Sequence, residues 1–146
     1  MKVEIKIDPQ CDETAVLIIA KEIDDEVNEL FKNLSRQNLH VVVGFKDDRA
    51  TALGVEEIIR IYAAMQKVFI VTDDGEYISK LRLYELEERL PSNKFVRTCN
   101  SEIVNLQKVR DFDLSFSGRI GVRFLDGSVT YVSRRYVTKI KKILGL

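Results

Sequence analysis

The stretch RIGVRFLDGSVTYVSRRYVTKIKKIL, residues 119–144, holds two alternating segments, a turn signal and a helical repeat in direct succession. Every second residue is apolar through much of RIGVRFL and SVTYVS, which predicts two strands. Asp126-Gly127 between them favours a tight turn, because glycine accepts the positive φ angles that such turns require. A helix is predicted to follow. Its predicted inward residues are Val137, Ile140, Ile143 and Leu144, and its predicted outward residues are Lys139, Lys141 and Lys142.

Upstream of this stretch, further short segments also read as strands. KFVRTC, EIVNLQKV and DFDLSF follow one another at intervals of about ten residues, which is typical of an antiparallel β fold. HVVVGFKDD predicts a strand that enters a polar turn, and KVFIVTDDGEYIS predicts a hairpin through Asp73-Asp74-Gly75. LRLYELEERLP predicts a short helix that Pro91 ends. Its apolar stripe consists of Leu83, Leu86 and Leu90.

The first 38 residues predict a separate small unit. KVEIKI alternates at period two and stops at Asp8-Pro9, so it predicts a strand that ends in a turn. TAVLIIA fits a helix or a strand, and its β-branched residues favour the strand. DDEVNELFKNLSRQ predicts a helix with Asp24 or Asp25 as its cap. We therefore expect a strand–strand–helix unit over residues 1–38 and a main domain over residues 39–146.

Composition indicates a soluble globular protein. The chain has 146 residues, of which 45% are hydrophobic and 32% charged, so one domain with a small appendage can bury a real core. The longest apolar run, Ala15 to Ala20, has six residues, far fewer than a membrane span requires. Met1-Lys2 leads straight into an alternating segment without the apolar stretch of a signal peptide. We expect a cytoplasmic protein.

The formal net charge of zero conceals an uneven distribution along the chain. Residues 1–38 hold five Lys/Arg against nine Asp/Glu, and residues 39–90 hold seven against ten. Residues 91–146 hold eleven against four, a net charge of +7. A basic third on an otherwise acidic chain predicts an anionic partner that approaches from one side.

Signals for an enzyme are weak. Nucleophilic catalysis usually needs a nearby base, and the only histidine, His40, opens an apolar segment where a structural role is favoured. The seven glycines are scattered and form no phosphate-binding motif. The paired aspartates suit caps and turns, and Cys11 and Cys99 lie too far apart for a zinc motif. We therefore expect a binding module with no catalytic site, no metal and no cofactor.

Four segments taken in order resemble a LytTR-type DNA-binding domain of the LytR/AlgR family: KVFIVTDDGEYI, LRLYELEERL, FVRTCNSEIVNL and GRIGVRFLDGSVTYVSRRYVTKIKKIL. The resemblance covers roughly residues 41–146. It implies a mainly β fold, α+β overall, with an elongated antiparallel sheet core and short flanking helices. It also implies a sequence-specific transcription regulator that presents loops to successive major grooves of double-stranded DNA.

The same resemblance implies three DNA-facing sites. RTCNS stands where the family has R.H.S, which puts Asn100 and Ser101 on one loop. Arg134 and Arg135 fall on the family's terminal SR loop, and Gln66 and Lys67 lie before the KVFIV strand. Cys99 or Asn100 replaces the histidine that is frequent in the family.

The chemistry of these side chains agrees with such roles. Arginine can bind guanine and asparagine can bind adenine through two hydrogen bonds, each pair contributing about 1–3 kcal/mol of discrimination. Arg134, Arg135 and Asn100 are therefore the predicted base readers. The predicted phosphate contacts are Arg97, Lys94, Lys139, Lys141 and Lys142. The alternatives are that the arginines merely begin a surface helix, that Asn100 is a turn residue and that the lysines form a solvated helix face.

Residues 1–38 are too few for a phosphoacceptor receiver domain, so the resemblance implies a stand-alone regulator. We expect this unit to form a dimer or to bind a partner. The family further implies a homodimer on paired direct repeats and, for stand-alone members, a membrane-bound regulatory protein as partner. The alternative function is a protein–protein interaction module without DNA binding, with the acidic amino-terminal unit as its working surface.

Overall fold

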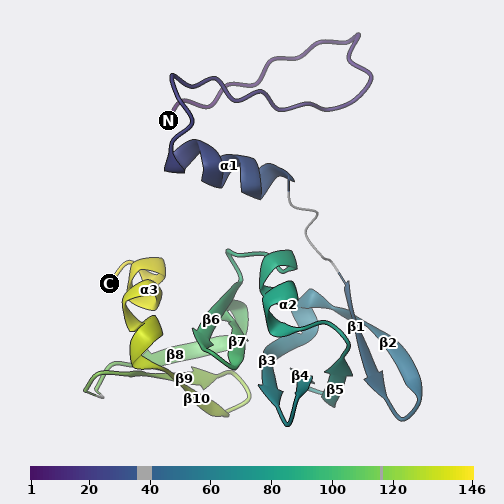
Figure 1. The fold of residues 1–146 in the computed structure, drawn as a ribbon, viewed down its shortest axis with the longest axis vertical. Helices are drawn as coiled ribbons and strands as arrows, with labels where there is room; N and C mark the ends of the chain where they lie inside the picture. Colours follow the sequence, from purple (N-terminus) through teal and green to yellow (C-terminus); the bar gives the residue numbers. More distant parts are fainter. Residues whose placement is uncertain (36–40, 116) are drawn as a thin grey trace. The chain divides into compact units, whose positions relative to one another are not determined.

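The computed structural model describes residues 1–35, 41–115 and 117–146. The chain divides into two compact units, Met1–Arg36 and Gln37–Leu146, and Figure 1 shows the elements of each. The domain boundary expected between residues 38 and 39 lies outside the described residues, as does His40.

The first unit contains one helix, α1 (Asp25–Ser35), in its described residues 1–35. Asp24 caps this helix as predicted, because its Oδ1 accepts a hydrogen bond from the backbone N–H of Val27 at 2.9 Å. The turn expected at Asp8-Pro9 is also present, with Cys11 N–H donating to Asp8 O at 3.1 Å. Helix and turn thus follow local sequence signals.

The prediction of two strands in the first unit is wrong. Residues 1–24, all of which are described, contain no strand. Their alternation specifies which side chains would share a face, but a strand also needs a paired neighbour and a cover for that face. Neither exists within the unit, and its apolar side chains lie exposed. They include Val3, Ile5, Ile7, Val16, Leu17, Ile19 and Ile23.

The second unit is built from antiparallel strands and two helices in its described residues. Its strands are β1 (Val41–Lys46), β2 (Arg49–Gly54), β3 (Ile58–Ala64), β4 (Lys67–Thr72), β5 (Gly75–Ser79), β6 (Phe95–Cys99), β7 (Glu102–Asn105), β8 (Val109–Asp113), β9 (Ile120–Phe124) and β10 (Val129–Val132). Its helices are α2 (Leu83–Arg89) and α3 (Arg134–Leu144), with 3-10 turns at Val55–Glu57 and Leu106–Lys108.

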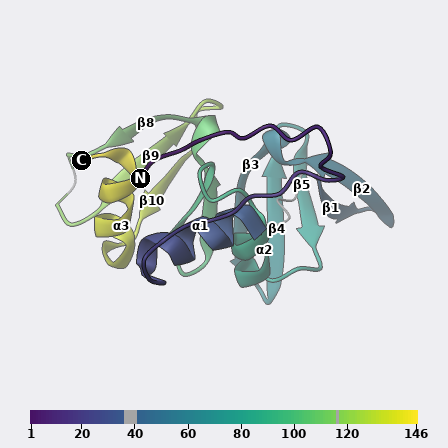
Figure 2. The ribbon, with the colours of Figure 1, turned by 90° about the horizontal axis from the view of Figure 1, so that it is seen from above.

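These strands form two sheets. Seven of the described strands pair in the order β2-β1-β5-β4-β3-β7-β6, and the other three in the order β10-β9-β8. Figure 2 shows the three-stranded sheet with α3 at one end of the unit and the β1–β2 hairpin at the other. The mainly β fold with short flanking helices is therefore confirmed.

Two hydrophobic cores lie on opposite faces of the shared strands β3, β6 and β7. The first core contains Ile58 and Ile61 of β3 and the buried leucines of α2, as the sequence predicts. The second contains Ile59 of β3, with the inner faces of β9, β10 and α3. Ile58 and Ile59 enter different cores because successive strand residues face opposite sides, and the register shift between Ile58 and Arg60 allows Ile58 and Ile61 to share the first core.

A buried asparagine supports this irregular part of β3. Asn105 is 1% exposed, and its Nδ2 donates a hydrogen bond to the carbonyl of Ile58 at 2.8 Å. Its Oδ1 accepts from the backbone N–H of Gln107 at 3.0 Å. Because a buried carbonyl without a partner is costly, Asn105 stabilises the point at which the two cores separate.

Helix α3 closes the second core, and the prediction is wrong for one of its four inward residues. Ile140 is buried and Val137 and Leu144 pack against the core. Ile143, however, is 44% exposed. It lies in the last turn of the helix, which ends at Gly145 with a φ of 75°.

Candidate nucleic-acid interface

The turn between β6 and β7 presents Asn100 and Ser101, both exposed. Its main chain is held by Arg97, whose Nε donates to Cys99 O at 3.0 Å and whose Nη2 donates to Asn100 O at 2.5 Å. Arginine's planar group carries several donors in fixed directions, so it can bind two adjacent carbonyls at once. The turn is therefore rigidly supported from within the protein.

The guanidinium group of Arg97 forms its hydrogen bonds with other groups of the protein. Its Nη1 forms an ion pair with Glu87 Oε2 of α2 at 2.5 Å, and its side chain is only 15% exposed. Sequence reasoning predicted a phosphate contact here. Its guanidinium instead links α2 to the β6–β7 turn, a role that sequence spacing did not reveal, because Glu87 lies ten residues away on another element.

The start of α3 lies directly against the same turn. Ser133 N–H donates to Thr98 O at 2.9 Å, and Tyr136 Oη donates to Asn100 Oδ1 at 3.0 Å. These bonds bring the exposed Arg134 and Arg135 close to the β6–β7 turn. Tyr136 was not among the predicted site residues, although its place in the first turn after the two arginines could have suggested it.

The first turn of α3 favours an anion. It contains Arg134 and Arg135 and no acidic residue, and Ser133 forms no side-chain cap. Arginines at this end oppose the helix dipole, whereas a phosphate near the free N–H groups would be stabilised. Arg134 folds beside Gly118 of the β8–β9 connection, where an added Cβ would lie 3.0 Å from Nε. No hydrogen bond to a described residue holds Arg135.

The third predicted site, the β3–β4 turn, lies at the same end of the sheet. Tyr62 of β3 pairs with Glu102 of β7, and Ala63 N–H donates to Ser101 O at 2.8 Å. The β3–β4 turn, which carries the exposed Gln66 and Lys67, therefore lies at the same end of the sheet as the β6–β7 turn (Figure 1). Strand spacing sets the two turns about 10 Å apart across the sheet.

The predicted phosphate contacts are distributed differently. Lys139 is exposed on α3, about one turn after Arg135. Lys141 and Lys142 are exposed near the helix end, about two turns away. Lys94 precedes β6, whereas Asn100 follows it, so Lys94 lies at the opposite end of that strand. The structure thus brings together the three predicted turns but not Lys94.

Beneath the β6–β7 turn, a buried carboxylate joins the two sheets. Glu102 Oε2 accepts from Arg60 Nη1 of β3 at 2.7 Å. Its Oε1 accepts from Thr130 Oγ1 of β10 at 2.6 Å and from Thr98 Oγ1 of β6 at 3.3 Å. Because charge-assisted hydrogen bonds are strong, this group fixes the neighbouring strands relative to one another.

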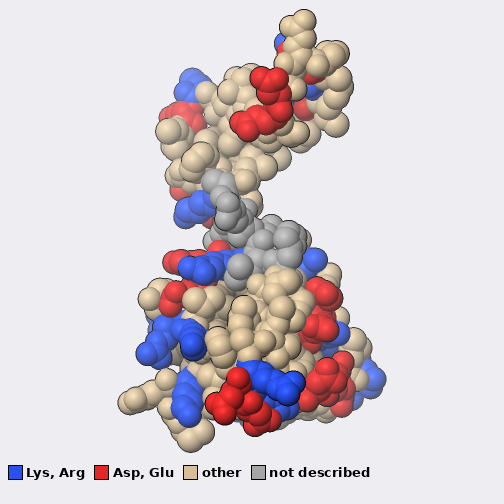
Figure 3. Space-filling model, turned by 90° about the vertical axis from the view of Figure 1, so that its right-hand side faces the viewer, with Lys and Arg blue, Asp and Glu red and all other residues tan. Residues whose placement is uncertain are grey.

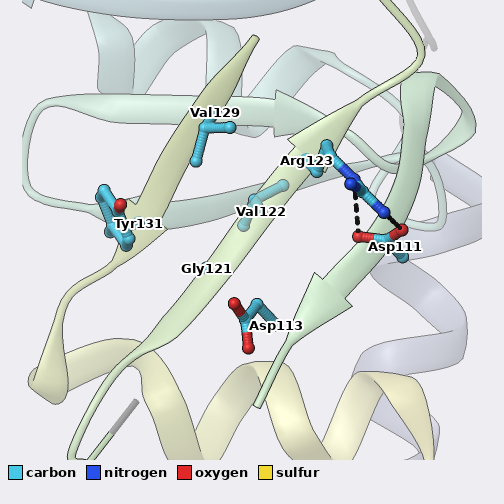
Figure 4. Close-up of a pocket in the computed structure, with 7 residues that line it drawn as sticks. All are labelled: Asp111, Asp113, Gly121, Val122, Arg123, Val129 and Tyr131. Carbon is cyan, nitrogen blue, oxygen red and sulfur yellow. Dashed lines mark hydrogen bonds and ion pairs between the residues drawn. The ribbon is translucent and has the colours of Figure 1, made fainter. Parts of the chain in front are cut away.

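A shallow hollow on the three-stranded sheet lies apart from these turns. Its lining residues are Asp111, Asp113, Gly121, Val122, Arg123, Val129 and Tyr131 (Figure 4). Arg123 forms an ion pair with Asp111, and Ser115 hydrogen bonds hold the pKa of Asp113 below its ordinary value. Two carboxylates and a neutralised arginine do not suit a polyanion, and no predicted DNA-binding residue lines the hollow.

Charge also distinguishes the two ends of the second unit. The face seen in Figure 3, toward the β1–β2 side, mixes basic and acidic residues. Acidic residues of this half include Asp47, Asp48, Glu56, Glu57, Asp73, Asp74 and Glu76. The residues with surplus positive charge, 91–146, build β6 to β10 and α3. Electrostatic attraction therefore favours an approach of DNA to the α3 end.

Within the described residues, no cluster of three or more histidine, cysteine or acidic side chains could hold a metal ion. None of the helices in the described ranges is long and apolar enough to cross a membrane. Cys11 and Cys99 are free thiols.

Comparisons with known proteins agree on one family. The LytTr DNA-binding domain family matches residues 48–145. Two uncharacterized HTH-type transcriptional regulators of Staphylococcus aureus, from strains MSSA476 and NCTC 8325, are each 31% identical over 147 residues, covering 100% of this chain and 99% of theirs. In the described part of this chain, strands separate each helix from the next, unlike a helix-turn-helix.

A solved structure supports the same assignment at the level of the fold. The LytTr DNA-binding domain of a Bacillus cereus response regulator superposes with a TM-score of 0.72 at 22% sequence identity. The match covers 75% of this chain and 100% of that domain. Together with the match over residues 48–145, these likenesses show that the chain belongs to the LytTR family of DNA-binding domains.

Proposed function

We propose that this chain is a transcription regulator that reads double-stranded DNA sequence-specifically through three surface segments. These are the β3–β4 turn, the β6–β7 turn and the start of α3. The observation that carries the proposal is their common location, supported by the Ala63–Ser101 and Tyr136–Asn100 hydrogen bonds. No enzymatic activity is needed for this function.

The residues of these segments divide by chemistry. Asn100, Ser101, Arg135 and Gln66 have side chains that can hydrogen bond to base edges in the major groove. Arg134 can bind bases or phosphates through its planar fork, whereas Lys67 and Lys139 suit phosphates because the charge of lysine acts without strict geometry. Arg97 acts by positioning the β6–β7 turn, since its donors already have protein partners. The three segments together can follow successive major grooves.

A salt series of DNA binding tests this function. A duplex selected by the full-length protein from a random-sequence pool is the probe, and fluorescence anisotropy gives the affinity. The logarithm of the binding constant should fall with the logarithm of salt at a slope of about −0.9 per phosphate contacted. If no duplex binds even at low salt, the protein is not a DNA-binding regulator.

Two substitutions test the division of roles. Arg135→Ala should relax the preference for one or two base pairs, because it removes a base contact. Lys139→Ala should weaken binding to all sequences alike and reduce the salt slope by about one. If both variants lose affinity equally for selected and unrelated duplexes, Arg135 does not read bases.

We further propose that residues 1–38 mediate assembly, with a second copy of this chain as the partner. Ile5, Ile19 and Ile23 are more than four-fifths exposed, and a unit of this size cannot bury them internally. Dimers would place two DNA-binding units on paired direct repeats. A membrane-bound regulatory protein is the other partner that this surface could bind.

Light scattering of the full chain distinguishes these partners. Wild-type protein should have the mass of a dimer, and Ile5→Asp with Ile19→Asp should yield monomers that still bind a single repeat. Lys6→Asp, an exposed charge change between apolar positions, is the matched control and should leave the dimer intact. A monomeric wild type that co-sediments with membranes would favour the membrane-bound partner instead.

A further inference from the structure

The β3–β4 turn contains two residues, Met65 and Gln66, in a left-handed backbone conformation that is energetically unfavourable for their side chains. Ala64 pairs with Lys67, so the loop consists of Met65 and Gln66 alone. Their φ angles are 50° and 62°, both in the left-handed region. Two-residue hairpin loops of this kind favour asparagine, aspartate and glycine, whereas methionine and glutamine are poorly suited. The hairpin itself therefore does not explain why methionine stands here.

The β1–β2 turn shows what the same geometry looks like without this conflict. Lys46 pairs with Arg49, and the two-residue loop is Asp47-Asp48, with φ angles of 51° and 62°. Aspartate accepts the left-handed region because its short side chain bonds locally to the backbone. One turn of the chain thus carries residues suited to its backbone, whereas the equivalent loop at the predicted DNA-binding end does not. An unfavourable backbone conformation that is kept at the β3–β4 turn points to a function of that turn.

Met65 also stands out by its exposure. Its side chain is 83% exposed at the tip of the turn. Beneath it, Arg82 Nη1 donates to Gln66 O at 3.3 Å and thereby supports the loop. The neighbouring exposed side chains of this end, Gln66, Lys67, Asn100 and Ser101, are all polar. Met65 is therefore an apolar tip on an otherwise polar surface.

We propose that Met65 is a specificity residue that contacts the 5-methyl group of thymine in the major groove. This inference rests on the DNA-binding function proposed above. The thymine methyl is the apolar group that base edges present in that groove. A thioether side chain is flexible and polarizable, so it can adapt to a methyl group without exact geometry. The contact would add thymine recognition to the hydrogen bonds made by the polar residues beside it.

Replacing thymine by uracil tests the contact by removing only that methyl group. Each thymine of the selected duplex is replaced in turn by deoxyuridine, and binding of wild type and Met65→Ala is measured by anisotropy. At one or two positions, uracil should weaken wild-type binding about three- to fivefold, as expected for one buried methyl. The same replacements should leave the affinity of Met65→Ala unchanged.

A matched pair of turn variants separates DNA contact from turn stability. Met65→Asn with Gln66→Gly should raise the melting temperature, because the new residues suit the turn, yet abolish sensitivity to uracil. Asp47→Asn with Asp48→Gly should also leave the protein at least as stable but retain the full uracil effect. Circular dichroism melts and the same anisotropy series give both readouts.

The outcomes are distinguishable. Uracil replacements that change the affinity of wild type and Met65→Ala equally, or change neither, would overturn the contact while leaving DNA binding intact. Loss of the uracil effect in the Asp47/Asp48 control would overturn it as well, because the effect would then not belong to Met65. Failure to select any duplex would overturn the proposed function and this inference together.

Discussion

Asn100 carries a side-chain amide whose oxygen already accepts a hydrogen bond from Tyr136 at 3.0 Å. That bond leaves both amide hydrogens available to acceptors outside the protein. An amide held this way can donate to base acceptors such as guanine or adenine N7, and the second lone pair of its oxygen can still accept from a donor such as adenine N6. At the scale of one residue, the Tyr136 hydroxyl therefore orients the side-chain amide that we propose contacts a base.

Tyr136→Phe should test this, because it removes only the hydroxyl and retains the packing of the ring. We expect a loss of about three- to tenfold in affinity for the selected duplex, within the range of one hydrogen bond, together with relaxed preference at one base pair. Tyr84→Phe, on the exposed side of α2, is the control and should change nothing. Selection from a random pool with each variant measures the preference. An unchanged base profile for Tyr136→Phe would contradict the role.

Helix α2 and the β6–β7 turn are connected by the ion pair between Glu87 and Arg97. Each of these elements was predictable from local signals. LRLYELEERLP has a leucine stripe and a terminal proline, and the strands of RTCNSEIVN follow from alternation. Their connection was not predictable, because ion pairs depend on distances between elements that spacing along the chain does not give.

Glu87→Gln shows whether Glu87 acts by positioning Arg97 or only by its negative charge, because the two roles change DNA affinity in opposite directions. Removing an acidic charge near bound DNA would by itself strengthen binding. If Arg97 needs Glu87 to hold the turn, binding should instead weaken, by about two- to tenfold for a charged hydrogen bond of this exposure. Glu88→Gln, the exposed neighbour, should leave binding unchanged or slightly stronger. A gain in affinity for both variants would refute the positioning role.

The same limit explains the errors in the first 24 residues. Alternation in KVEIKI predicts a face, not the existence of a neighbouring strand. TAVLIIA is apolar enough for either structure, and in this structure it forms neither. The helix Asp25–Ser35, by contrast, was predictable because its cap and its apolar spacing are local. In the first unit, therefore, the sequence correctly predicted the helix and the turn, which form from neighbouring residues, but not the strands, which need a second strand to pair with.

At the scale of the whole molecule, Glu102 fixes one sheet against the other through Arg60, Thr98 and Thr130. It follows the β6–β7 turn by one residue, so the support of the fold and the candidate DNA-binding surface meet at the same place. The sequence predicted a strand over EIVNLQKV, of which β7 forms the first four residues, but it gave no indication that the glutamate is buried. A charged residue at 6% exposure depends on partners from three other strands.

Glu102→Ala should destabilise the second unit by about 2–4 kcal/mol, because it leaves the partly buried Arg60 and the hydroxyl of Thr130 without their acceptor. Thr130→Val, which removes one of these hydrogen bonds and retains the shape, should cost only about 1 kcal/mol. Urea unfolding followed by circular dichroism measures both. Equal losses for the two variants would mean that the carboxylate does not join the sheets.

Ile58 and Ile59 are consecutive residues that pack into different cores, with strand β3 as the wall between them. A change in the size of either side chain shifts a backbone that both cores share. During divergence of the family, substitutions on one side of this wall would have to be matched by substitutions on the other. The two halves of the second unit are therefore expected to co-evolve, even where their side chains never touch.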